Sequence, residues 1–231
     1  MAFLGHSARL LVFHESPHNV APVWQGAGFE IVTEDEAECV LTDGQLFVVI
    51  RQGHSSAPTL EYLAASLQSV KDKLVAAGIQ PSMIAVDGLH IKGPGLLEYA
   101  VAPATAANVM HRTGDGNPIL GYVDALVVPV ESADASAVWS QKCGYFIAEA
   151  TGTHVPCVDV TDGIWMLSFR EQSLAPPFLH YTADIDEEWI DQLLSVLPNA
   201  VVKRDEHGCA TLVICELPGG VRIMITSDEI E

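Results

Sequence analysis

The chain has 231 residues and a formal net charge of −19 at pH 7, which opposes binding to nucleic acid or to anionic membranes. Its content of 49% hydrophobic and 18% charged residues is typical of a packed globular protein rather than a disordered one. No apolar run is long enough for a membrane helix, and the N-terminus lacks the features of a signal peptide, so we expect a cytoplasmic protein without membrane partners.

The first half of the chain predicts two successive copies of a strand, a helix and three further strands. In the first copy we expect a strand over 8–16, a helix over 17–24 and strands over 29–33, 38–41 and 46–51. In the second copy we expect a strand over 59–65, a helix over 66–77 and strands over 83–86, 89–91 and 96–101. The second helix is predicted from an apolar stripe that includes Leu67, Val70 and Leu74, with Gly78 as its stop.

The same pattern returns in the second half, after a segment rich in Ala, Gly, Thr, Asn and Pro. In the third copy we expect a strand over 124–130, a helix over 133–142 and strands over 145–149, 156–160 and 164–170. In the fourth we expect a strand over 178–184, a helix over 186–197 and strands over 200–205, 211–216 and 221–226. We therefore predict a domain over 1–104, a linker over 105–120 and a second domain over 121–231.

A repeated motif supports this division. Residues 40–50 and residues 159–169 both contain a Thr-Asp-Gly turn before an apolar strand, and the two stretches lie 119 residues apart. At the same offset Leu60-Glu61-Tyr62 matches Leu179-His180-Tyr181. An offset shared over so long a stretch indicates a duplicated unit.

The order and spacing of these elements resemble the vicinal oxygen chelate superfamily, which includes glyoxalase I, bleomycin-resistance proteins, fosfomycin-resistance transferases and extradiol dioxygenases. The segments most similar to this family are Gly28-Phe29-Glu30-Ile31, Leu41-Thr42-Asp43-Gly44, residues 60–78, and Pro218-Gly219-Gly220-Val221-Arg222-Ile223. The resemblance implies an α+β fold made of two glyoxalase-like domains in tandem. Each domain would consist of two βαβββ modules that form a half-open barrel around a cavity.

The resemblance also implies a divalent metal, such as Zn, Fe, Mn or Ni, held by one residue from the first and the last strand of each module. In the first half these positions fall on Arg9, near Val49, on Glu61, and on Glu98 or Tyr99. In the second half they fall on Asp124, near Leu167, on His180 and about Met224. Each half thus offers at most two plausible ligands, so we expect no complete catalytic metal site. The candidate metal ligands are Asp124 and His180 of the second half.

Pairing of these side chains with one another is the alternative to metal binding. Arg9 and Glu61 suit a buried ion pair that either stabilises the fold or binds a polar ligand. Asp124 could pair with His180, or could lie at a solvated strand start. Trp165 could line a pocket for a planar ligand.

These interpretations lead to three functional hypotheses. We expect a protein of the bleomycin-resistance kind that binds a small organic molecule, neutral or cationic, in a barrel cavity without a cofactor. The alternative is a metal-dependent lyase or an extradiol-type dioxygenase that uses Asp124 and His180, so the sequence leaves open whether the protein is an enzyme. A third hypothesis is a protein without a ligand whose open sheet edges mediate association with a second copy, as a homodimer, or with another protein.

Overall fold

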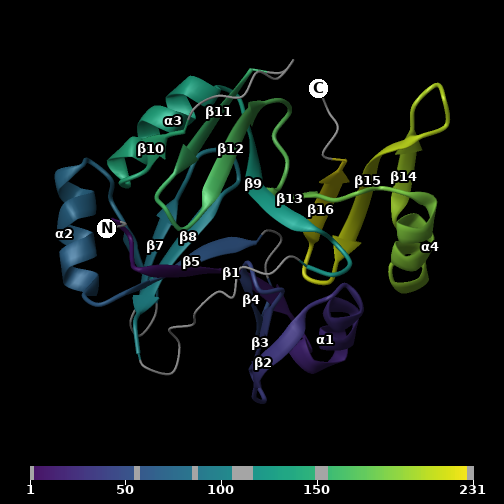
Figure 1. Cartoon of the computed structure of the whole chain (residues 1–231). Helices are drawn as coiled ribbons and strands as arrows, with labels where there is room; N and C mark the ends of the chain where they lie inside the picture. The colour runs from purple at the N-terminus through teal and green to yellow at the C-terminus, as the bar shows by residue number, and fades with distance from the viewer. Residues whose placement is uncertain (1–2, 55–57, 85–87, 106–116, 149–155, 228–231) are drawn as a thin grey trace. The chain divides into compact units, whose positions relative to one another are not determined.

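The computed structural model describes residues 3–54, 58–84, 88–105, 117–148 and 156–227. Within them the chain forms four modules, each a strand and a helix followed by three strands (Figure 1). The elements of the first half are β1 Ser7–His14, α1 Pro17–Gly26, β2 Glu30–Glu34, β3 Glu38–Thr42, β4 Phe47–Gln52, β5 Thr59–Ala64, α2 Leu67–Ala76, β6 Ser82–Ile84, β7 Gly88–Lys92 and β8 Glu98–Pro103. The elements of the second half are β9 Tyr122–Val130, α3 Ala133–Lys142, β10 Phe146–Ile147, β11 Cys157–Thr161, β12 Met166–Glu171, β13 Phe178–Thr182, α4 Glu187–Val196, β14 Val201–Arg204, β15 Ala210–Leu217 and β16 Val221–Thr226. The predicted α+β class and the four βαβββ modules are confirmed.

The strands form two eight-stranded sheets with the same topology. The strand order is β2-β3-β4-β1-β5-β8-β7-β6 in one sheet and β10-β11-β12-β9-β13-β16-β15-β14 in the other. The last three strands of a module are antiparallel neighbours, whereas its first strand pairs in parallel with its last, as β5 does with β8 and β13 with β16. Because equivalent strands hold equivalent places, the sheets carry the repeat that the sequence indicated.

Contacts between Cα atoms divide the chain into two compact units. Unit 1 comprises Met1–Leu10, Ala57–His111 and Leu126–Pro177, and unit 2 comprises Leu11–Ser56, Arg112–Ala125 and Phe178–Glu231. Unit 1 therefore contains α2 and α3, and unit 2 contains α1 and α4. The expected domain boundaries follow the halves of the chain instead and stay a prediction, and residues 106–116 of the expected linker lie outside the described residues.

The helix starts follow from local chemistry. The side chains of Ser66, Ser132 and Asp186 each accept a hydrogen bond from the backbone N–H three residues later, at the start of α2, α3 and α4. These bonds satisfy amide groups that have no partner inside the helix. Helix α1 begins instead with Pro17, which needs no such partner because it has no N–H.

The first Thr-Asp-Gly turn holds unit 2 together through the buried Asp43. Oδ1 of Asp43 accepts hydrogen bonds from the backbone N–H groups of Gln45 and Leu46, both at 2.9 Å. Oδ2 of Asp43 accepts a third hydrogen bond, at 2.7 Å, from the hydroxyl of Tyr181 on β13. Three donors thus satisfy a carboxylate that would be costly to bury alone.

The second Thr-Asp-Gly turn repeats this arrangement in unit 1. Oδ1 of Asp162 accepts from the backbone N–H groups of Ile164 and Trp165, at 2.9 and 3.0 Å. Oδ2 of Asp162 accepts from the hydroxyl of Tyr62 on β5 at 2.7 Å, and this hydroxyl also lies 2.5 Å from that of Tyr145. We call the Asp43–Tyr181 and Asp162–Tyr62 arrangements the Asp–Tyr clasps; they give the duplicated motif a structural role.

Candidate functional site

His180 is the centre of the candidate site in unit 2. It lies on β13 between Leu179 and Tyr181, whose side chains are fully buried. Because successive residues of a strand point to opposite faces of the sheet, His180 points away from the face that these two residues occupy. His180 itself is 8% exposed. An imidazole ring, whose two nitrogens can both take part in hydrogen bonds, is therefore held almost completely inside the protein.

Both ring nitrogens of His180 have hydrogen-bond partners. Nδ1 lies 2.9 Å from Oδ2 of Asp124 on β9, and Nε2 lies 2.9 Å from Oγ1 of Thr226, the last residue of β16. Because a carboxylate only accepts, Nδ1 carries a proton, and Nε2 of the neutral ring accepts from the threonine hydroxyl. When the ring is protonated, Nε2 donates to the same hydroxyl, so the arrangement accommodates both charge states. The side chain of Asp124 is 57% exposed, so solvent also reaches this carboxylate.

Apolar side chains accompany this polar group on the same face of the sheet. In the register of β13 and β16, His180 is the direct neighbour of Met224, and Met224 is the direct neighbour of Ile214 on β15. Met224 and Ile214 are both half-buried. One polar group beside partly accessible apolar side chains is the composition expected of a small-molecule site.

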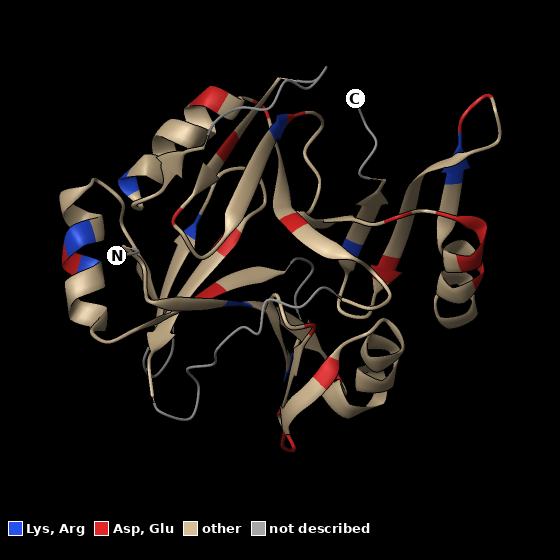
Figure 2. Ribbon diagram, in the orientation of Figure 1, with Lys and Arg blue, Asp and Glu red and all other residues tan. Residues whose placement is uncertain are grey.

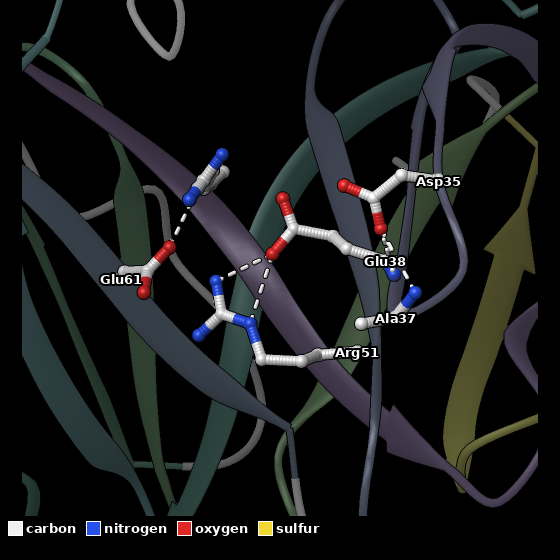
Figure 3. A network of polar contacts seen from close by, with 6 residues as sticks. Asp35, Ala37, Glu38, Arg51 and Glu61 are labelled. Atoms are coloured by element: carbon white, nitrogen blue, oxygen red, sulfur yellow. Dashed lines mark hydrogen bonds and ion pairs between the residues drawn. The ribbon is translucent and has the colours of Figure 1, made fainter.

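Arg9 and Glu61 form the equivalent pair in unit 1. Arg9 on β1 and Glu61 on β5 are 6% and 3% exposed, and Nε of Arg9 donates to Oε2 of Glu61 at 2.6 Å (Figure 3). The predicted ion pair is therefore present. Both alternatives for Asp124 hold in part, because its carboxylate bonds to His180 while its side chain is 57% exposed. The two pairs also occupy equivalent positions, since each joins the first strand of one module to the first strand of the next.

The residues at the predicted metal positions do not fit a divalent metal. In the second half, Leu167 and Met224 offer no nitrogen or oxygen ligand, and both nitrogens of His180 are already hydrogen-bonded. Within the described ranges, no three His, Cys, Asp or Glu side chains lie together in a way that could hold a metal ion. Catalytic sites for such metals need three protein ligands. The site as built offers Asp124 and His180 as a hydrogen-bonded pair instead.

Two further residues that the sequence singled out, Trp165 and Glu98, lie outside these two pairs. Trp165 in unit 1 is 5% exposed, and its backbone N–H donates to Asp162, so a role of its side chain in ligand binding stays a prediction. The side chain of Glu98 is 43% exposed, and its Oε2 lies 3.3 Å from Nε2 of His90. Sequence reasoning missed Thr226, because only the pairing of β13 with β16 brings its hydroxyl to His180.

Acidic residues lie on many elements, and basic residues are few (Figure 2). No helix within the described residues is long and apolar enough to cross a membrane.

Comparison with known proteins finds similarity in structure alone. No protein-family model matches the sequence, and no curated protein sequence matches it significantly. Homoprotocatechuate 2,3-dioxygenase from Arthrobacter globiformis is similar over 97% of this chain and 80% of its own, with a TM-score of 0.63 and 12% identity. A catechol 2,3-dioxygenase is similar over 98% of this chain and 89% of its own, with a TM-score of 0.61 and 12% identity. An extradiol ring-cleaving dioxygenase from B. fuscum is similar over 97% and 71%, with a TM-score of 0.59 and 14% identity.

These likenesses concern the fold. The chain has the two-domain glyoxalase-like fold that the sequence resemblance implied. At 12–14% identity they leave its ligand and its chemistry open.

Proposed function

We propose that this chain binds a small organic molecule at His180 without a divalent metal. The observation that carries the proposal is the closed hydrogen-bond array Asp124–His180–Thr226, which occupies both nitrogens of the histidine at a family metal position. A metal could bind His180 only by displacing one of these partners, and the aliphatic side chains at neighbouring positions would add no ligand. The half-buried Met224 and Ile214 supply apolar contact for a ligand.

The array determines what His180 can do for such a ligand. Because Asp124 accepts the proton on Nδ1, the basic nitrogen of the ring is Nε2, which faces the hydroxyl of Thr226. A ligand hydroxyl or ammonium group that takes the place of the Thr226 hydroxyl would donate to Nε2. The exposed carboxylate of Asp124 and the net charge of −19 favour a neutral or cationic ligand. A hydrogen bond to Nε2 and the apolar contacts are sufficient for binding or sequestration of such a ligand. A proton transfer to Nε2 is the one chemical step that the array could support.

Two measurements test the proposal. A thermal-shift screen of neutral and cationic aromatic compounds is expected to find at least one that stabilises the chain. That stabilisation should disappear in His180→Ala and persist in Glu206→Gln, since the Glu206 side chain is 88% exposed. Elemental analysis after incubation with Zn, Mn, Fe(II) or Ni and desalting should find far less than one metal ion per chain. One tightly held ion per chain that is lost in His180→Ala would overturn the proposal.

The second candidate is a ring-cleaving dioxygenase, favoured by the structural similarity to extradiol dioxygenases. It requires metal ligands in addition to Asp124 and His180. Oxygen uptake with catechol or homoprotocatechuate after anaerobic loading with Fe(II) or Mn(II) distinguishes the two candidates. Metal-free binding predicts no uptake above that of the protein-free solution.

A further inference from the structure

Arg9 is a buried cation whose hydrogen-bonding capacity is mostly unused. Its guanidinium has five N–H donors, and its side chain is only 7% exposed. One donor, on Nε, is bound by Glu61. The four donors on Nη1 and Nη2 have no hydrogen-bond partner among the described residues. Neither Nη nitrogen is among the fully buried atoms without a partner, so this edge of the guanidinium is accessible to water or to an acceptor from outside the chain.

Two other arginine–carboxylate pairs use the guanidinium differently. Arg51 donates from both Nε and Nη2 to Oε2 of Glu38, at 2.9 and 2.6 Å (Figure 3). Arg204 donates from Nη1 and Nη2 to the two carboxylate oxygens of Glu187. In both pairs the Nη groups contribute, whereas in the Arg9–Glu61 pair the bond comes from Nε of Arg9 and the planar Nη1–Nη2 edge faces elsewhere. That edge matches the spacing of two carboxylate oxygens.

The neighbouring strands continue the polar face from Glu61. The register pairs Glu61 with Ala100 on β8 and Ala100 with His90 on β7, so these three side chains share one face of the sheet. Ala100 places only a methyl group between the buried ion pair and the half-buried His90–Glu98 pair. A small apolar surface between two polar groups suits the body of a small organic acid.

We propose that the Nη1–Nη2 edge of Arg9 binds the carboxylate of a small organic monocarboxylic acid, whose body lies toward Ala100 and His90. Glu61 holds the guanidinium in place from its Nε side and keeps the local charge low before the ligand arrives. The net charge of −19 disfavours ligands with several negative charges, so one carboxylate is the preferred number. This site is in unit 1 and does not depend on the proposal for His180.

Benzoate and pyruvate are suitable probes, with benzamide as the uncharged control of the same shape as benzoate. In thermal-shift assays at about 10 mM probe, where a millimolar site is nearly saturated, at least one carboxylate should raise the melting temperature and benzamide should not. Titration calorimetry should show affinity weakened about tenfold or more in Arg9→Lys, because an ammonium group cannot make the two parallel bonds. The exposed pair supplies the matched control: Arg204→Lys should leave the affinity unchanged.

A readout on the unmodified chain covers the case in which Arg9 variants do not fold. In ¹⁵N-resolved spectra of arginine side chains, the Nη signals of Arg9 should shift on addition of the carboxylate and stay in place with benzamide. The proposal is overturned if neither carboxylate shifts these signals, since water alone would then satisfy them. It is also overturned if a folded Arg9→Lys variant binds the carboxylate as tightly as the parent chain.

Discussion

The two Asp–Tyr clasps predict a loss of stability that two conservative changes, Tyr62→Phe and Tyr181→Phe, can measure. Each change removes one hydroxyl and keeps the buried ring. Asp162 or Asp43 then loses a 2.7 Å hydrogen bond inside the protein, while the turn amides continue to bind its other oxygen. A hydrogen bond to a charged group contributes about 1.5–3 kcal/mol, so each variant should lower the free energy of unfolding by about that amount.

The two clasps should not respond equally. The hydroxyl of Tyr62 also contacts the buried hydroxyl of Tyr145, whereas Phe29, the residue equivalent to Tyr145 in the first module, has no hydroxyl to offer Tyr181. Tyr62→Phe thus leaves two groups without their partner, and we expect about 1 kcal/mol of additional loss.

Urea unfolding followed by fluorescence and by circular dichroism measures both effects. Two probes are needed because the clasps lie in different units, which need not unfold together. Tyr122→Phe is the matched control: Tyr122 is 61% exposed, so its change should stay within about 0.5 kcal/mol. If the clasp variants are no less stable than this control, the buried carboxylates do not depend on the tyrosines, and the reasoning is refuted.

Three further predictions concern glycines, thiols and pH. Gly28 and Gly78 both follow helices with φ near +80 to +90°, but a Cβ at Gly28 would lie 2.3 Å from Oδ1 of Asn117 and one at Gly78 would meet nothing. Gly28→Ala should therefore lower the unfolding midpoint in urea more than Gly78→Ala, which carries only the backbone strain of about 1 kcal/mol. Burial raises the pKa of Cys143 to about 12, so a thiol reagent at pH 8 should modify the exposed Cys209 quickly and Cys143 only after unfolding. Burial also raises the pKa of four tyrosines well above 10.0, namely Tyr62, Tyr99, Tyr145 and Tyr181. Above that pH the unfolded chain therefore loses protons that the folded chain keeps. The free energy of unfolding should then fall by up to about 1.4 kcal/mol per pH unit for each tyrosine, and tyrosinate absorbance should appear together with unfolding.

Local patterns were sufficient to predict the elements. The helix expected over 133–142 is observed over those residues, because Ser132 caps its start and Gly144 follows its end. The motif offset also relates Glu61 to His180, and each of these residues pairs with the first strand of the preceding module. Spacing was informative here because equivalent residues of duplicated strands keep equivalent places in their sheets.

Long-range pairing could not be predicted in the same way. The hydroxyl of Tyr181 reaches Asp43, 138 residues away, and that of Tyr62 reaches Asp162, 100 residues away. The two aspartates and the two tyrosines each repeat at the same offset in the sequence, yet this spacing does not indicate which aspartate bonds to which tyrosine. The hydrogen bond between Thr226 and His180 could not be predicted for a related reason. It depends on the register of β13 and β16, and a one-residue change in that register would turn the Thr226 side chain to the opposite face.

The two equivalent pairs differ in their chemistry, and this difference bears on what each half can do. Arg9–Glu61 joins a guanidinium to a carboxylate, and the guanidinium can position an oxyanion through parallel hydrogen bonds. Asp124–His180 joins a carboxylate to an imidazole ring, and its acid is far more exposed than Glu61. A duplicated framework with one guanidinium pair and one imidazole pair is therefore suited to two different ligand groups.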